Sequence, residues 1–120
     1  METLQASELL GALGHENRLA IFRLLVEAGP DGVIASAIGD ELGMVPATLS
    51  FHLAHLTRVG LITRKRQSRF IRYSADYETM DDLIAFLTNN CCQGTACLPK
   101  TAAGNSTAVQ RRRRSNTSLA

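Results

Sequence analysis

Three cysteines, Cys91, Cys92 and Cys97, lie within one short segment of the 120-residue chain, which has no others. Thiolates are soft ligands, and trivalent arsenic could accept three of them in a pyramid with its lone pair on the open side. Zinc fits less well because it prefers four ligands. The spacing therefore favours a soft-ion site in which one chain supplies all three sulfurs.

The chain around the cysteines could bring the sulfurs together. An apolar helical pattern ends near Asn90, and at a fraying helix end the backbone can turn Cys91 and Cys92 toward one point. Gly94 would then let the segment fold back, so that Cys97 completes the triangle.

Other interpretations of the cysteines stay open. Cysteines near a helix end can be packing residues, and thiolate pairs can form disulfides, which would make the segment a redox switch. A disulfide between the neighbours Cys91 and Cys92 would be strained, whereas one between Cys91 and Cys97 would close more easily. A thiol enzyme would need a positioned base or a pocket signature, and the sequence has neither. We expect no enzymatic activity.

Charge is divided along the chain. Residues 1–57 carry mostly acids, whereas residues 58–72 carry bases and no acid, which points to contact with a polyanion. There is no apolar run of membrane-spanning length and no signal segment, so we expect a cytoplasmic protein without membrane contact. Thiols in that compartment normally stay reduced.

Apolar periodicity and helix-stop residues predict a mainly helical chain with one small β-hairpin. In order, the expected elements are a first helix around Leu9, Leu10 and Leu13, helices over 15–30, 34–43 and 46–60, a hairpin over 61–75 and a last helix over 76–90. Thr3 or Ser7 would begin the first helix, and Asp76 would cap the last one.

Two helices joined by a bend at Gly43 and followed by a basic hairpin predict a winged helix-turn-helix. Leu49, Leu53 and Leu56 would bury the second of these helices, whose other residues could then reach base edges in a DNA major groove. The hairpin bases would contact phosphates. The expected DNA-binding residues are Ala47, Thr48, Ser50, Phe51, His52 and His55 on the helix, and Arg64, Lys65, Arg66 and Arg69 on the hairpin. The alternative is that they form an ordinary solvated surface.

Three stretches of the chain, "LGHENRLAIFRLL", "LGMVPATLSFHLAHLTRVGLI" and "TRKRQSRFIRYS", resemble the ArsR/SmtB family of winged-helix metalloregulators over residues 5 to 90. The resemblance implies a homodimer, paired through its first and last helices, that binds double-stranded operator DNA until a metal or metalloid releases it. Apolar residues available for such an interface are Leu9 and Leu13 on the first helix and Leu83, Ile84 and Leu87 on the last.

The family places its sensing ligands in several positions. One site is a Cys-x-Cys motif in the third helix, but "IASAIGDEL" has no cysteine; another needs histidines on the last helix, which has none. The remaining stretch, "CCQGTAC", resembles the variant arsenic sensors with cysteines at the end of the dimerisation helix. We therefore expect Cys91, Cys92 and Cys97 to bind arsenite as inducer, with no constitutive cofactor. Methylarsenite and antimonite are open alternatives as inducers, as is a methylarsenite-selective site of two cysteines.

These predictions divide the chain into three parts. Residues 1–90 would form the DNA-binding and dimerisation domain, residues 91–97 the sensing segment, and residues 98–120 a disordered basic tail. The tail ends in the run Arg111 to Arg114, which would either add phosphate attraction or serve no such role.

Overall fold

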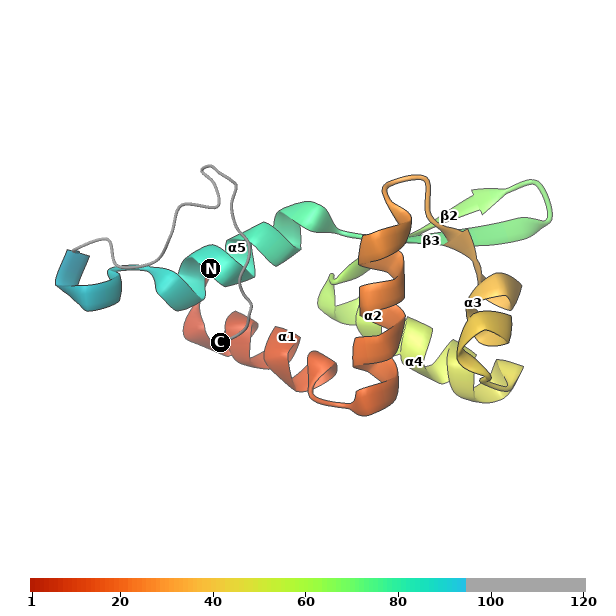
Figure 1. Cartoon of the computed structure of the whole chain (residues 1–120), viewed down its shortest axis with the longest axis horizontal. Coiled ribbons are helices and arrows are strands. Elements are labelled where there is room, and N and C mark those ends of the chain that lie inside the picture. The colour runs from red at the N-terminus through yellow and green to blue at the C-terminus, as the bar shows by residue number, and fades with distance from the viewer. Residues whose placement is uncertain (95–120) are drawn as a thin grey trace. The chain divides into compact units, whose positions relative to one another are not determined.

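The computed structural model describes residues 1–94, and both Cys97 and the predicted tail lie outside this range. Residues Met1–Leu87 form one compact unit, and a second unit begins at Thr88. The elements are α1 (Thr3–Leu13), α2 (Glu16–Ala28), β1 (Val33–Ile34), α3 (Ala35–Leu42), α4 (Pro46–Val59), β2 (Ile62–Gln67), β3 (Phe70–Ala75), α5 (Tyr77–Thr88) and a 3₁₀ turn, η1 (Cys91–Gly94) (Figure 1). The predicted fold class, a winged helix-turn-helix with five helices and a β-hairpin, is confirmed.

Most helix ends follow from local chemistry. Gly43 and Gly60 end α3 and α4 in the left-handed conformation, and Pro46 begins α4. Asp76 caps α5 as predicted, because its Oδ1 accepts a hydrogen bond of 3.1 Å from the backbone N–H of Thr79. Helix α1 begins at Thr3, one of the two predicted starts, and its N-cap residue, Glu2, makes no side-chain hydrogen bond.

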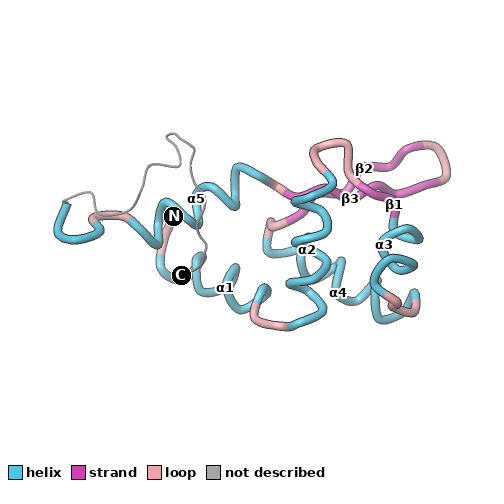
Figure 2. The backbone as a smooth tube through the Cα atoms, viewed as in Figure 1, coloured by secondary structure: helices cyan, strands magenta, loops and turns pink. Residues whose placement is uncertain are grey.

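The hairpin extends into a three-stranded antiparallel sheet of order β1-β3-β2 (Figure 2). The two-residue strand β1 was not predicted, and Ile34 was assigned to a helix. In the structure Ile34 pairs with Arg72 of β3 and ends the strand just before α3 begins. Two residues are too few for an alternating pattern to be seen in the sequence.

The core joins the five α-helices and the base of the sheet. Its fully buried side chains include Leu9, Ile21, Leu25, Leu53 and Leu56. None of the helices in residues 1–94 has the length and apolar character that a bilayer crossing needs.

Two residues predicted at a dimer interface belong to this core. Leu9 is 1% exposed and Leu83 is 5% exposed, and both pack in the same cluster within the chain. The sequence showed that α1 and α5 are apolar but not which stripe each helix turns inward. Ile84 and Leu87, which were also predicted there, are exposed at 53% and 55%. The exposed large apolar residues of α1 are Leu4 at 71% and Leu10 at 44%.

Gly32, in the turn before β1, lies close to the wing, which is the hairpin formed by β2 and β3. Its φ is +78°, and a Cβ there would lie 2.5 Å from the carbonyl oxygen of Tyr73. We expect Gly32→Ala to lower the free energy of unfolding by about 1–3 kcal/mol, through strain and collision. In urea titrations, the matched change Gly11→Ala should instead raise it by about 0.5–1 kcal/mol, because Gly11 lies inside α1 with open space around it. Equal effects at both positions would contradict this account.

Candidate nucleic-acid interface and cysteine segment

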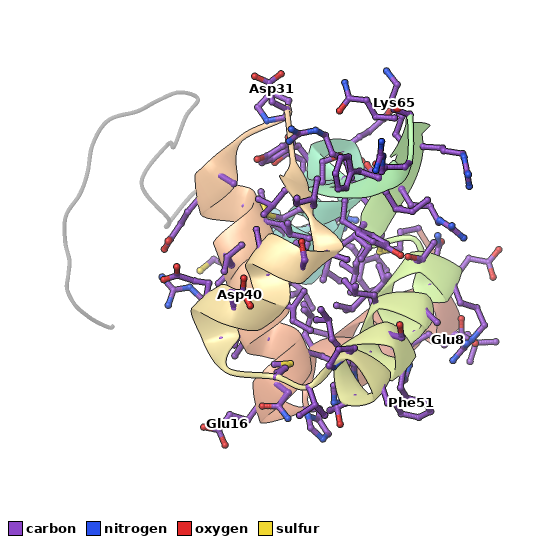
Figure 3. All side chains as sticks on the ribbon, turned by 90° about the vertical axis from the view of Figure 1, so that its right-hand side faces the viewer. Glu8, Glu16, Asp31, Asp40, Phe51 and Lys65 are labelled. Atoms are coloured by element: carbon purple, nitrogen blue, oxygen red, sulfur yellow. The ribbon has the colours of Figure 1, made fainter. Side chains whose placement is uncertain are left out.

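Helix α4 presents a polar outer face because its leucines hold the opposite face in the core. Leu49, Leu53 and Leu56 are all buried, as the spacing predicted. Ala47, Thr48 and Ser50 are exposed near the start of the helix, where small side chains allow a close approach to base edges. Phe51 is 68% exposed and points away from the core (Figure 3).

His52 does not face outward, so that part of the prediction is wrong. Its side chain is only 5% exposed, and its Nδ1 has no hydrogen-bond partner. The position follows Leu49 by three residues and precedes Leu56 by four, which places it beside the buried stripe. Its ring lies 4.8 Å from that of His15, centroid to centroid. A buried ring cannot reach a base edge, so His52 is left out of the surface proposed below to bind DNA.

The junction of α1, α2 and α4 disfavours protonation of the α4 histidines. Burial lowers the pKa of His52 from its ordinary 6.5, with further lowering by His15, Arg18 and His55. Burial also lowers the pKa of the half-buried His55, aided by Arg18 and Arg58. Arg18 is fixed here because its Nε donates to the carbonyl of Ala12 at 2.7 Å. The N-cap of α2 is His15, whose Nδ1 accepts from the N–H of Asn17.

Strand alternation divides the wing bases between two faces. Ile62 pairs with Ala75 and Arg64 with Tyr73, so these residues share the face that packs on the core and α4. Lys65 pairs with Arg72 and therefore lies on the opposite face. Arg66 lies with Arg64, and Arg69 is exposed in the turn. The sequence grouped these bases by proximity in the chain, but period-two geometry separates them.

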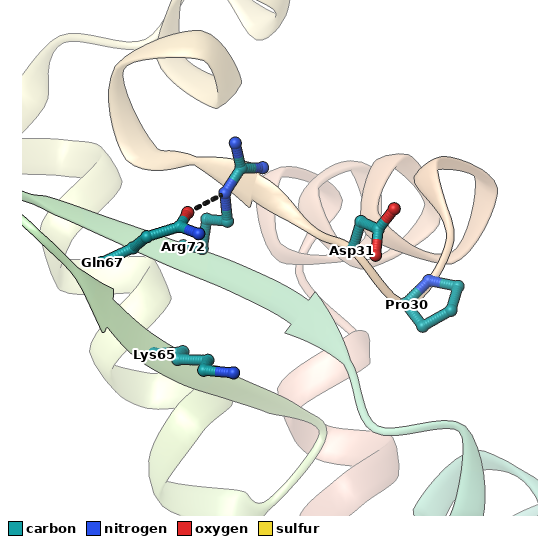
Figure 4. A pocket seen from close by; sticks show the side chains of 5 residues that line it. All are labelled: Pro30, Asp31, Lys65, Gln67 and Arg72. Atoms are coloured by element: carbon teal, nitrogen blue, oxygen red, sulfur yellow. Dashed lines mark hydrogen bonds between the residues drawn. The ribbon is translucent and has the colours of Figure 1, made fainter.

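On the Lys65 face, Arg72 ties the wing to the turn between α2 and β1. Its Nε donates to Oε1 of Gln67 at 2.6 Å (Figure 4). Its Nη1 donates to the carbonyl of Gly32 at 3.1 Å. Lys65, Gln67 and Arg72 border a pocket of about 460 Å³ that Pro30 and Asp31 complete. Because Arg72 is engaged with the protein itself, it acts as a positioning residue for the wing.

The sequence reasoning missed two residues, Arg58 and Tyr73, that the fold places near Ser50 and Arg64. They line a cleft between α4 and the wing. Arg58 follows Ser50 by eight residues, about two helical turns, which is a spacing visible in the sequence. The position of Tyr73 depends on the register of the hairpin, which the sequence does not show.

The described cysteines lie in the second unit. Cys91 is half-buried, Cys92 is exposed, and their Sγ atoms are 3.5 Å apart. Positive φ values at Asn90 (59°), Cys92 (55°) and Gln93 (58°) turn the chain sharply through η1. Within residues 1–94 there is no cluster of three or more His, Cys, Asp or Glu side chains arranged to hold a metal. The predicted third ligand, Cys97, lies beyond that range.

The α4 histidines predict acid sensitivity. A histidine whose pKa is lowered by folding takes up protons preferentially when unfolded, so its stabilising effect is complete above pH 6.5 and declines as pH falls below it. Urea unfolding between neutral and mildly acidic pH should show this loss, with a slope of at most about 1.4 kcal/mol per pH unit for each group. His52→Leu should flatten the dependence more than His55→Gln, because His52 is the more buried. A profile unaffected by His52→Leu would contradict this assignment.

Comparisons with known proteins agree with this geometry. A family model described as a helix-turn-helix domain matches residues 13–65. The HTH-type transcriptional regulator YgaV of Escherichia coli is 35% identical over 88 residues, covering 73% of this chain and 87% of the relative. Reduced HlyU from Vibrio cholerae is 27% identical, with a TM-score of 0.59 over 76% of this chain and 93% of that one.

A homodimeric winged helix-turn-helix domain, Mb0332 from Mycobacterium bovis, is described as a possible ArsR-family transcriptional regulator. It is 23% identical, with a TM-score of 0.57 over 79% of this chain and 88% of that one. The chain therefore belongs to the helix-turn-helix transcriptional regulators, the family of its Escherichia coli relative, and has the winged-helix fold of ArsR-family proteins.

Proposed function

We propose that the protein is an arsenite-responsive repressor, which binds operator DNA as a dimer and leaves it when Cys91, Cys92 and Cys97 bind trivalent arsenic. The 3.5 Å separation of the Cys91 and Cys92 sulfurs carries the proposal. Two thiolates bound to one ion at about 2.3 Å, the length of a zinc–thiolate bond, lie roughly 3–4 Å apart. The positive-φ turn at Cys92 thus gives the neighbouring thiols a spacing suited to a shared soft ion.

The proposed operator surface combines α4 and the wing. Thr48 and Ser50 would hydrogen-bond to base edges, and Phe51 would offer an apolar contact to a thymine methyl group. Arg64, Arg66 and Arg69 would contact phosphates, as would Lys65 from the far face of the wing. Phosphate contacts would give affinity for any duplex, and the α4 residues would supply the preference for the operator.

The proposed inducer can be tested through the third ligand. Inorganic arsenite can take three sulfurs, whereas methylarsenite keeps one carbon and has two positions left for thiolates. We expect Cys97→Ser to need at least about tenfold more arsenite for release from DNA, the loss of a net ligand contribution of roughly 1.4 kcal/mol. Its response to methylarsenite should be retained. Cys91→Ser and Cys92→Ser should impair both responses.

Release would be followed by fluorescence anisotropy on a labelled operator, under a reductant that binds arsenic weakly. Each variant must first bind DNA like the wild type without inducer. If Cys97→Ser responds to arsenite as the wild type does, the three-sulfur site is wrong and a two-cysteine sensor of organoarsenicals replaces it. Zinc and peroxide serve as control inducers, and release by zinc alone would point to another metal site.

One observation favours a second candidate function, thiol redox sensing. The related Vibrio cholerae protein is named as a reduced form, and two thiols of this chain lie within 3.5 Å of each other. Because a disulfide between adjacent residues is strained, the oxidised pair would more readily include Cys97. Release by peroxide without any response to arsenite would establish this alternative.

We further propose that the dimer pairs through the exposed stripes of α1 and α5. Leu4 and Leu87 are among the most exposed large apolar side chains of the described residues. A second copy of the chain is the proposed partner, because the Mycobacterium bovis protein with this fold is described as homodimeric. In this revised interface Leu9 and Leu83 support the two helices from within.

The interface predicts a charge-sensitive assembly. The double change Leu4→Glu and Leu87→Glu should give monomers at micromolar concentration in sedimentation experiments, because it places like charges in the apolar contact. Operator affinity should then fall by at least about tenfold, roughly 1.4 kcal/mol, since only one half-site is held at a time. Leu19→Glu, an exposed leucine of α2, is the matched control and should remain dimeric. A double variant that stays dimeric would exclude this interface.

A further inference from the structure

The outer face of α4 and one face of the wing meet in a cleft of about 270 Å³. The residues that line it are Ser50, Ala54, Thr57 and Arg58 from α4, Arg64 from β2 and Tyr73 from β3. The cleft therefore connects the helix expected to read bases with the hairpin expected to contact phosphates.

Strand register fixes the wing's side of the cleft. Arg64 and Tyr73 are cross-strand partners, and the adjoining pair on the same face, Ile62 and Ala75, is buried in the core. The buried pair holds that face against α4, so the next pair outward along the strands must lie beside the exposed part of the helix. A one-residue slip would bring Lys65 to the cleft in place of Arg64.

The charged groups in the lining are all positive. Arg58 and Arg64 are exposed, and neither makes an ion pair or hydrogen bond with any of residues 1–94. The hydroxyls of Ser50 and Tyr73 likewise have no hydrogen-bond partner there, whereas Thr57 uses its own to donate to the carbonyl of Leu53 at 2.7 Å. Two guanidinium groups, two hydroxyl donors and no carboxylate suit an oxyanion with several acceptor oxygens.

We propose that Arg58 and Arg64 share a single phosphate of the DNA backbone in this cleft, with Ser50 and Tyr73 as additional donors. Ala54 adds only a methyl group to the lining. One phosphate would then be bound from both α4 and β2. This shared contact would fix the position of α4 relative to the wing when both are bound to the duplex. This inference rests on the DNA-binding part of the proposed function and is independent of the inducer.

The salt dependence of DNA binding reports how many phosphates the protein neutralises. The slope of log K against log salt is about −0.9 for each phosphate that the protein neutralises on duplex DNA. If one phosphate is shared, Arg58→Ala or Arg64→Ala alone should weaken binding severalfold yet change the slope by well under 0.9, since the other arginine still neutralises it. The double variant should flatten the slope by about 0.9. Tyr73→Phe should weaken binding with no change in slope.

Binding is measured by anisotropy on a short random-sequence duplex from about 50 to 200 mM salt, without arsenic. Arg23→Ala on α2 is the charge-matched control, because it removes one exposed arginine that pairs with Glu27 away from the wing, and it should leave the slope unchanged. Arg58→Lys and Arg64→Lys, which keep the charge, should retain the wild-type slope. Circular dichroism and urea unfolding confirm that each variant is folded.

Two results would overturn the proposal. If each single alanine variant flattens the slope by about 0.9 and the double variant by about 1.8, the arginines contact separate phosphates. If the double variant keeps the wild-type slope, the cleft does not touch DNA. Neither result depends on arsenite, so a protein that fails to respond to arsenite but shows the shared-phosphate pattern would refute only the proposed inducer.

Discussion

The buried leucine stripe of α4 is the constraint on which the rest of the molecule depends. Leu49, Leu53 and Leu56 each bury an apolar side chain worth about 1.5–3 kcal/mol, and together they fix the rotation of the helix about its axis. That rotation decides which residues meet solvent. It exposes Ser50 and Phe51, and it turns His52 inward against His15. The rotation of α4 therefore determines both the proposed DNA-binding surface and the burial of His52, from which the acid sensitivity is predicted.

The wing is positioned by the same principle and then secured by polar contacts. Ile62 and Ala75 anchor its base in the core. Because side chains alternate along the strands, Arg64 lies on the same face, two residues further along β2. Arg72 ties the other face to the carbonyl of Gly32, a residue whose conformation and crowding exclude a side chain. A hairpin held at both faces can present its arginines at a defined distance from α4, which a loosely attached wing could not do.

The sequence revealed those features that depend on neighbours along the chain. The Gly43 bend, the start of α4 at Pro46 and the Asp76 cap are local events, and the structure confirms them. The features that it missed depend on which stripe of an element faces a distant partner. Leu9 and Leu83 lie in the core, and Lys65 lies on the opposite face of the wing from Arg64. Helix rotation and strand register are both set by tertiary packing, which the sequence does not show. The proposed cysteine chemistry rests on residue type, while the proximity of two sulfurs depends on the backbone turn at Cys92.

The proposed signal must travel along the chain from the cysteine segment to α5, which directly precedes it. Helix α5 is lightly held: Leu83 is its only buried residue, and Tyr77 at its start donates to the carbonyls of Val26 at 2.9 Å and Leu25 at 3.3 Å. An inducer can shift an equilibrium only by its preference for one state, typically about 1–3 kcal/mol. A helix buried along a whole stripe would resist a bias of that size. Helix α5 is fixed at its first turn, and Leu83 is its only fully buried side chain, while Met80 and Phe86 are partly buried against the core. Such a helix would respond to a bias of that size, and the Tyr77 contact with α2 would pass the response toward the helix-turn-helix.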